Sequence, residues 1–193
     1  MPVLRKLLRD DHAAQIMEFA VVLPLLAVMV VGIFDFGQAF SIRQKLTFAA
    51  RDAARFGSSQ PTNDLTQATP ISVSAIRDLV DADMLSAGLN DCGLGTISQS
   101  GAVAWSATGT AGTCPSSATF TLTIDRGYVA PPIGQPGINV PGSGEPLRLI
   151  STHVIMSYPY QWHFNSVIKL LVPSATYAGI TQITTDAVAP NQD

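Results

Sequence analysis

A long apolar run near the N-terminus constrains the fold of this chain more than any other feature. It extends from Ala13 to Phe34, about 22 residues, or roughly 33 Å of α-helix at about 1.5 Å per residue. The hydrocarbon core of a bilayer is about 30 Å thick. No charged side chain occurs between Phe19 and Phe34. The length and the lack of charge predict a retained membrane span over residues 14–34.

Two other kinds of segment can also contain an apolar run near the N-terminus. A cleaved secretory signal has a basic start, an apolar stretch of about 7–15 residues and then a small-residue cleavage site. Arg5, Lys6 and Arg9 supply a basic start, but the run is followed by bulky residues where that site is needed. A buried core helix is the second alternative, and such helices are rarely this long and this uncharged.

The distribution of basic residues does not decide which way the span is oriented. Three basic residues precede it and four follow it closely: Arg5, Lys6, Arg9; Arg43, Lys45, Arg51, Arg55. Long C-terminal domains cross a membrane largely regardless of their charge. The two cysteines, Cys92 and Cys114, lie in that domain, and a cysteine pair in a small extracytoplasmic domain usually forms a disulfide. We therefore expect an external domain with this disulfide, the alternative being two buried thiols.

The helix is expected to continue beyond the span. Residues 35–57 contain no proline, and apolar side chains recur there at helical spacing: Ile42, Leu46, Ala49, Ala53, Phe56. Ala49, Ala53 and Gly57 stand four residues apart and form a ridge of small side chains that permits close packing. The sequence predicts one long helix over residues 14–57, with Gly57 as its C-cap and Pro61 beyond it.

The remaining residues, 60–193, are expected to form one α+β domain. Within it we predict helices over residues 69–88 and 164–173, strands over residues 117–125, 146–160 and 179–188, and a proline- and glycine-rich loop over residues 130–146. Pro159 should end the middle strand. The aromatic segment around Tyr158, Tyr160 and Trp162 is interpreted as core packing, with a membrane-interface belt as the alternative. The predicted fold is a long transmembrane helix packed on a small antiparallel sheet.

Glu18 is the unusual residue of the span. A charge inside a bilayer is costly, and less so near the interface, where Glu18 lies. One interpretation is a protonated or snorkelling side chain with no role; the other, which is the default for ionisable residues in a membrane, is a functional charge that pairs with a cation in the same low-dielectric zone. The span itself offers no cation. On the functional interpretation, the partner must therefore come from another chain or from a newly created N-terminal amine.

These residues resemble the N-terminal signature of TadE-like proteins, the pseudopilins or minor pilins of the Flp/Tad (tight adherence) pilus system. The matching positions are Ala13, then "EFAVVLP" from Glu18 to Pro24, Gly32, Asp35-Phe36-Gly37, and "AARDAAR" from Ala49 to Arg55. The segment from "VIMSYPYQWHF" to the C-terminus is a looser match to the same family.

The resemblance implies a mechanism of assembly. A prepilin peptidase of the aspartyl membrane type would remove a basic leader, residues 1–13, by cutting between Ala13 and Ala14. The family usually has glycine where this chain has Ala13. The amine of Ala14 would then pair with Glu18 of a neighbouring subunit. The implied partners are other pilin or pseudopilin subunits, the peptidase, the Tad inner-membrane platform and membrane lipid. The resemblance implies a single-pass protein of the bacterial inner membrane whose C-terminal domain lies in the periplasm. It also implies that the subunit can be incorporated in a surface pilus.

The sequence offers little support for catalysis or for a cofactor. It contains no phosphate-binding glycine loop, no nucleophile elbow and no HExxH helix, and its histidines are not at metal-ligand spacing. Asp78, Asp81 and Asp83 are interpreted as a solvated face, since calcium needs more oxygen ligands from a loop. From Gly57 onward nine acidic and four basic side chains leave a net charge of about −5, which disfavours nucleic acid.

The sequence therefore predicts a structural subunit with no cofactor and no enzymatic activity. Two alternatives are a periplasmic binding or enzymatic domain that the helix merely tethers, and a pseudopilin of a type II secretion-like machine.

Overall fold

The computed structural model describes residues 11–110, 114, 118–132, 147–163 and 180–192, with side chains from Gln15 onward. The chain divides into two compact units. One contains residues 1–39 and 161–179, and the other contains residues 40–160 and 180–193. The predicted helix over residues 164–173 and most of the predicted loop over residues 130–146 lie outside the described residues.

The N-terminal helix α2 runs from Asp11 to Ser58, with Pro24 inside it. Its bounds agree closely with the single long helix predicted from the sequence. The part from Phe40 onward belongs to the second unit and carries the alanine ridge. Leu46, Ala49, Ala50 and Ala53 are at most 3% exposed, so this side of α2 forms part of the core.

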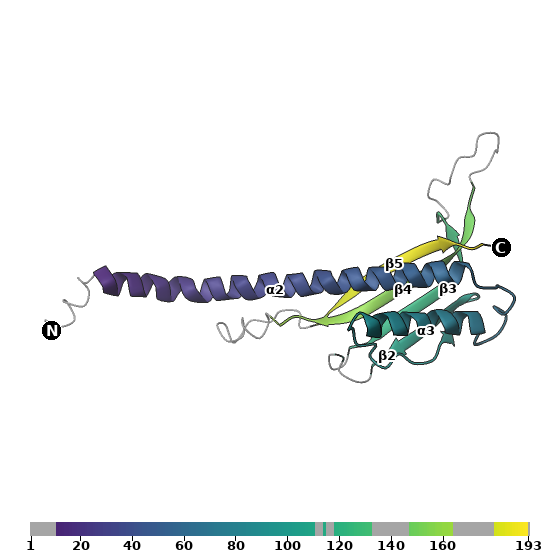
Figure 1. Cartoon of the computed structure of the whole chain (residues 1–193), viewed down its shortest axis with the longest axis horizontal. Coiled ribbons are helices and arrows are strands. Elements are labelled where there is room, and N and C mark those ends of the chain that lie inside the picture. Colours follow the sequence, from purple (N-terminus) through teal and green to yellow (C-terminus); the bar gives the residue numbers. More distant parts are fainter. Residues whose placement is uncertain (1–10, 111–113, 115–117, 133–146, 164–179, 193) are drawn as a thin grey trace. The chain divides into compact units, whose positions relative to one another are not determined.

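The second unit contains one helix besides the end of α2, and an antiparallel sheet. Helix α3 spans Ile71–Ser86. The strands are β1 (Ser98–Gln99), β2 (Ala104–Gly109), β3 (Phe120–Ala130), β4 (Leu149–Gln161) and β5 (Ile180–Pro190), and they lie side by side in chain order. The end of α2 and α3 cover one face of this sheet (Figure 1). The α+β class predicted from the sequence is confirmed.

The core lies between the two helices and the sheet. Strand β3 alternates as predicted, because Phe120, Leu122 and Ile124 are at most 1% exposed while the threonines between them face the other side. Side chains from α3 and the neighbouring strands complete the core: Val73, Ile76, Val80, Met84, Trp105, Val154, Met156. Burying an aliphatic side chain of this size contributes about 1.5–3 kcal/mol, so this layer dominates the stability of the unit.

Three details differ from the sequence-based expectations. Strands β1 and β2 were not predicted. Strand β4 continues through Pro159 to Gln161, and its last pairing with β3 is Ser157 with Thr121, so the missing N–H of Pro159 removes no bond of that ladder. Gly57 is not a C-cap, because it lies within α2, and the glycines with positive φ among the described residues are Gly88 and Gly93.

Gly57 instead allows α2 to approach its neighbours. A Cβ atom at this position would lie 2.8 Å from Thr152 Cγ2 and 2.9 Å from Ile76 Cδ1. Gly57→Ala should therefore destabilise the protein by about 1–3 kcal/mol, partly offset by the better helix propensity of alanine. The check is the free energy of unfolding in denaturant. Gly37→Ala is the matched control, because no atom lies within 4 Å of that position, and equal effects of the two substitutions would contradict the packing argument.

Candidate functional site: the long N-terminal helix

The first part of α2 presents apolar side chains all around the helix. Large side chains at least 42% exposed occur at nearly every turn: Ile16, Met17, Phe19, Val21, Val22, Leu23, Leu25, Leu26, Met29, Val30, Ile33, Phe34. Within the described residues, α2 is the one helix long and apolar enough to cross a membrane, and none of its most apolar window is buried by the chain. A helix that is apolar on every side is typical of a protein core or a membrane span.

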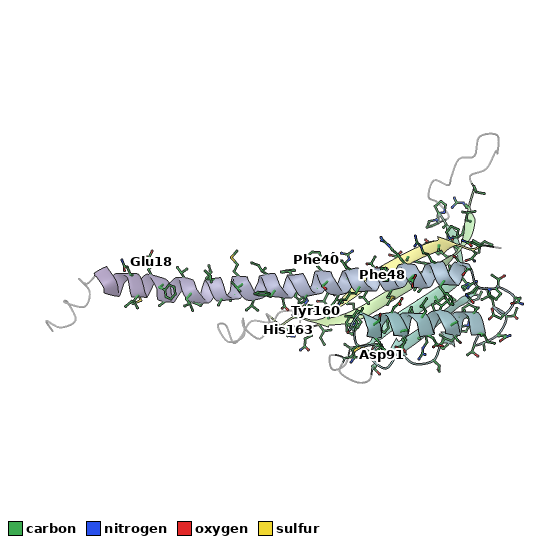
Figure 2. The ribbon with its side chains drawn as sticks, viewed as in Figure 1. Glu18, Phe40, Phe48, Asp91, Tyr160 and His163 are labelled. Atoms are coloured by element: carbon green, nitrogen blue, oxygen red, sulfur yellow. A yellow bond between two sulfur atoms is a disulfide. The ribbon has the colours of Figure 1, made fainter. Side chains whose placement is uncertain are left out.

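Glu18 lies in this apolar part of α2 and is exposed (Figure 2). Ala13 and Ala14 lie in the first turn of α2, and the structure describes their backbone only. Ala14 and Glu18 are four residues apart, so they occupy the same face of the helix, one turn from each other. Peptidase cleavage between Ala13 and Ala14 and pairing of Glu18 between subunits stay predictions.

Asp35 marks the end of the apolar run, and its partner was not predicted from the sequence. Its carboxylate is 3% exposed, and Oδ1 lies 3.1 Å from Nδ1 of His163, just after β4. The adjacent residues also meet, because the rings of Phe36 and Trp162 pack edge to face with centroids 5.1 Å apart. Two consecutive residues of α2 thus contact two consecutive residues that follow β4.

One sequence signal could have suggested this contact. Asp35 is the first charged residue after the uncharged run, and a carboxylate next to an apolar segment needs a polar partner. The Trp162-His163 pair carries both an aromatic ring and an imidazole, but it is separated from Asp35 by 128 positions. Tyr158 and Tyr160 of the same aromatic segment are 8% and 4% exposed, in agreement with their interpretation as core residues.

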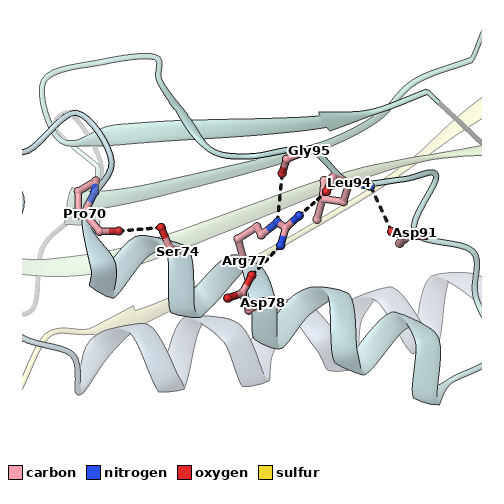
Figure 3. Close-up of polar contacts among 7 residues, drawn as sticks. All are labelled: Pro70, Ser74, Arg77, Asp78, Asp91, Leu94 and Gly95. Atoms are coloured by element: carbon pink, nitrogen blue, oxygen red, sulfur yellow. Dashed lines mark hydrogen bonds and ion pairs between the residues drawn. The ribbon is translucent and has the colours of Figure 1, made fainter.

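The structure joins Cys92 and Cys114 in a disulfide, with Cα atoms 5.4 Å apart, as expected from the sequence. The loop that carries Cys92 is also tied to α3. Arg77 donates from Nε to the carbonyl of Gly95 at 3.1 Å and from Nη2 to the carbonyl of Leu94, and its Nη1 lies 2.6 Å from Asp78 Oδ1 (Figure 3). The disulfide and the arginine together fix this loop against the domain.

Asp78 and Asp81 of α3 form an acidic edge together with Asp91 of the following loop. Burial, and then the nearby charge of Asp91, raise the pKa of Asp81. Burial alone would also raise the pKa of Asp91, but the backbone N–H groups of Gly93 and Leu94 donate to its carboxylate and lower it. No group of three or more possible metal ligands occurs among the described residues.

Asp81→Asn should raise the melting temperature at pH 7, on the order of 2 °C. Because folding raises the pKa of Asp81, its protonated form is favoured in the native state. The contribution of the protonated Asp81 to stability is fully present below the pKa of the unfolded state, about 3.9. That contribution is lost as the pH rises through the pKa of the folded state. The asparagine removes the repulsion from Asp91, so the gain should disappear near pH 3. Thermal melts at both pH values check this, and Asp78→Asn, which breaks the ion pair with Arg77, should give no gain.

The long helix matches a known protein family. Residues 13–55 match the model of a family described as TadE-like protein. This chain carries a TadE-like segment. The TadE-like segment begins in the first turn of α2 and ends in its last turn, so it includes both the apolar part and the alanine ridge, and it leaves α3 and the sheet outside. This match confirms the resemblance of the N-terminal segment, and the looser resemblance of the C-terminal segment lies outside the matched residues. Comparison with curated proteins and with solved structures gives no match.

Proposed function

We propose that this chain is a structural subunit of a Tad/Flp pilus system, acting as a minor pilin or pseudopilin that is anchored in the inner membrane. The observation that carries the proposal is the coincidence of the TadE-like segment with α2. One continuous helix has an apolar first part and a second part packed on an α+β domain. This division suits a subunit that is stored in a membrane and used in an assembly.

In the proposed arrangement, residues 14–34 span the inner membrane and the α+β domain lies in the periplasm. The disulfide between Cys92 and Cys114 supports this orientation, since disulfides persist in oxidising compartments such as the periplasm. Partners on this account are other pilin or pseudopilin subunits, the prepilin peptidase, the Tad inner-membrane platform and membrane lipid. The chain has a structural role and no enzymatic one.

Ala13, Ala14 and Glu18 have the central roles in this proposal. The peptidase removes residues 1–13, and the new amine at Ala14 supplies the cation that Glu18 lacks within the span. In an apolar medium an unpaired charge is costly, and a partner of opposite charge offsets much of that cost. Pairing between neighbouring subunits would therefore fix the stagger of their helices.

The test is the intact mass and N-terminal sequence of the chain recovered from membranes and from sheared surface pili. A mature chain that starts at Ala14 is expected in both fractions. Ala13→Lys should block cleavage because the peptidase requires a small residue, whereas Ala13→Gly, which restores the usual family residue, should be cut at least as well as the wild type. A chain that still starts at Met1 and occurs only in membranes would contradict the proposal and favour a plain tether.

A further inference from the structure

Asp35 and Phe36 lie at the level where α2 should leave the hydrocarbon core of a membrane. The predicted span, residues 14–34, is about 31 Å long as an α-helix, and the hydrocarbon core is about 30 Å thick. The two residues follow the span directly, within about 3 Å along the helix axis. The interfacial layer on each side of the core is roughly 5–8 Å deep. Both residues therefore fall within that layer, at the C-terminal end of the span.

Trp162 and His163, which follow β4, contact α2 at this same level. They belong to the compact unit that contains the span. The ring of Trp162 packs edge to face on Phe36, with centroids 5.1 Å apart. His163 is exposed and lies beside α2 (Figure 2), with its Nδ1 3.1 Å from Oδ1 of Asp35. The two contacts therefore hold Trp162 and His163 at the depth of the interfacial layer.

The aromatic rings of this cluster suit a membrane interface. Tryptophan is enriched there because the indole combines an apolar ring with a polar N–H group. Trp162 is half-buried and Phe36 is 57% exposed, so both rings are accessible from outside the chain. Phe36 also lies one turn after Ile33, which is 61% exposed, so the accessible surface continues that of the span. Tyr158 and Tyr160 differ, because they are at most 8% exposed and belong to the core.

The carboxylate of Asp35 is buried although it directly follows the apolar run. A charge at this level is ordinarily solvated by water or headgroups, but this side chain is 3% exposed, so the chain itself must supply its partners. His163 supplies one, since the N–H at Nδ1 can donate to the carboxylate. Removing a partner from a buried charge costs more than a surface ion pair contributes. The pair therefore constrains where the residues after β4 lie along α2.

We propose that Trp162 anchors the chain to lipid in the interfacial layer, and that the pair of Asp35 and His163 holds the indole at this depth. The partner is the headgroup and glycerol region of the bilayer. An apolar helix can tilt or shift in a membrane, and interfacial aromatic residues are what fix its placement. The inference rests on the proposed function of a membrane-anchored subunit and deepens it by naming the surface that sets how far the span is inserted.

The experiment measures quenching of tryptophan fluorescence in the full-length chain reconstituted into phosphatidylcholine vesicles. The chain contains two tryptophans, so Trp105→Phe leaves Trp162 as the emitter. Bromine atoms on the acyl chain close to the headgroup should quench Trp162 more than bromine atoms near the end of the acyl chain, and aqueous iodide should quench it weakly. Trp162→Phe is the matched control, because Trp105 is fully buried in the second unit and should respond to neither probe. Thermal melts verify that each variant is folded.

Substitutions of the ion pair, made together with Trp105→Phe, test whether it holds the indole. Asp35→Ala and His163→Ala should each shift the ratio of anchored to released Trp162 roughly tenfold toward release, since a half-exposed pair is worth more than a surface pair and less than a buried one. Quenching by bromine near the headgroup should fall and quenching by iodide should rise. His163→Asn keeps an N–H near the position of Nδ1 and should retain the anchored state.

Asp186→Ala is the matched control for the ion pair. It breaks a contact of the same kind in the second unit, where His153 Nε2 lies 3.2 Å from Asp186 Oδ2, and it should leave the quenching of Trp162 unchanged. Unchanged quenching in both Asp35→Ala and His163→Ala would overturn the role of the pair.

Three results would overturn the lipid contact itself. Quenching of Trp162 by iodide alone would place the ring in water, and strongest quenching by the deep bromine atoms would place it in the hydrocarbon core. Quenching by neither probe would mean that protein covers the ring, as in the core-packing interpretation. The N-terminal sequence and the incorporation into pili are measured separately. A chain that is never cleaved can still show this lipid contact, so failure of the contact and failure of the proposed function are distinguishable.

Discussion

Replacing Trp105 with alanine should lower the free energy of unfolding by about 3–5 kcal/mol, the usual cost of removing a buried aromatic side chain. Trp105 lies on β2 and is fully buried between the sheet and the helices. Its Nε1–H donates to the carbonyl of Ala68 at 3.1 Å, in the segment that precedes α3. Truncation would therefore leave a cavity, and it would also remove the N–H group that donates a hydrogen bond to the partly buried carbonyl of Ala68. Of all single substitutions considered for this chain, it should have the largest effect on stability.

Denaturant unfolding of the full-length chain in detergent measures this effect. Trp105→Phe separates the two contributions, because phenylalanine keeps much of the packing but cannot donate to Ala68, and its cost should be smaller. Phe48→Ala is the matched control, since it removes an aromatic ring that is 69% exposed and should change the free energy of unfolding by about 0.5 kcal/mol or less. A cost for Trp105→Ala close to that of Phe48→Ala would show that the core does not depend on this residue.

The elements with strong periodicity were predictable from the sequence. Helix α2 combines an apolar run with alanines four residues apart, and Pro24 is the only proline within it. Strand β3 alternates phenylalanine, leucine and isoleucine with threonine, which is the pattern of a sheet with one buried face. The end of α3 was predicted from Gly88, whose positive φ allows the N–H of Leu89 to bond the carbonyl of Met84.

Elements built from small side chains, and contacts between distant residues, were not predictable in this way. Strand β2 places Trp105, Ala107 and Gly109 on the buried side, and the last two give almost no hydrophobic signal. Gly109 is needed there because a Cβ atom would lie 2.8 Å from the carbonyl oxygen of Cys92, a contact that only the folded chain reveals. The contact of Asp35 with His163 depends in the same way on where β4 ends, which no local pattern encodes.

Glu18 is expected to be essential for incorporation into an assembly and unimportant for folding. It lies among exposed apolar side chains of α2, outside the unit that contains the core. On the proposed function it pairs with the Ala14 amine of a neighbouring subunit in a region where an unpaired charge at the centre costs about 2.5–3.5 kcal/mol and less near the interface. A lone subunit tolerates this cost by protonation or by placing the carboxylate near the headgroups. An assembled subunit instead gains a charge pair that selects one stagger of the helices.

Glu18→Ala should therefore reduce the amount of chain in sheared surface pili at least roughly tenfold, as expected for the loss of one charge pair per contact in a low-dielectric medium. The amount in the membrane and the N-terminus at Ala14 should not change. The measurement is quantitative immunoblotting of the sheared and membrane fractions with intact masses of both. Asp52→Ala is the matched control, because it removes an exposed carboxylate from the same helix beyond the apolar run. Normal incorporation of Glu18→Ala would mean that the helix acts only as a tether, since a tether has no use for a charge at this position.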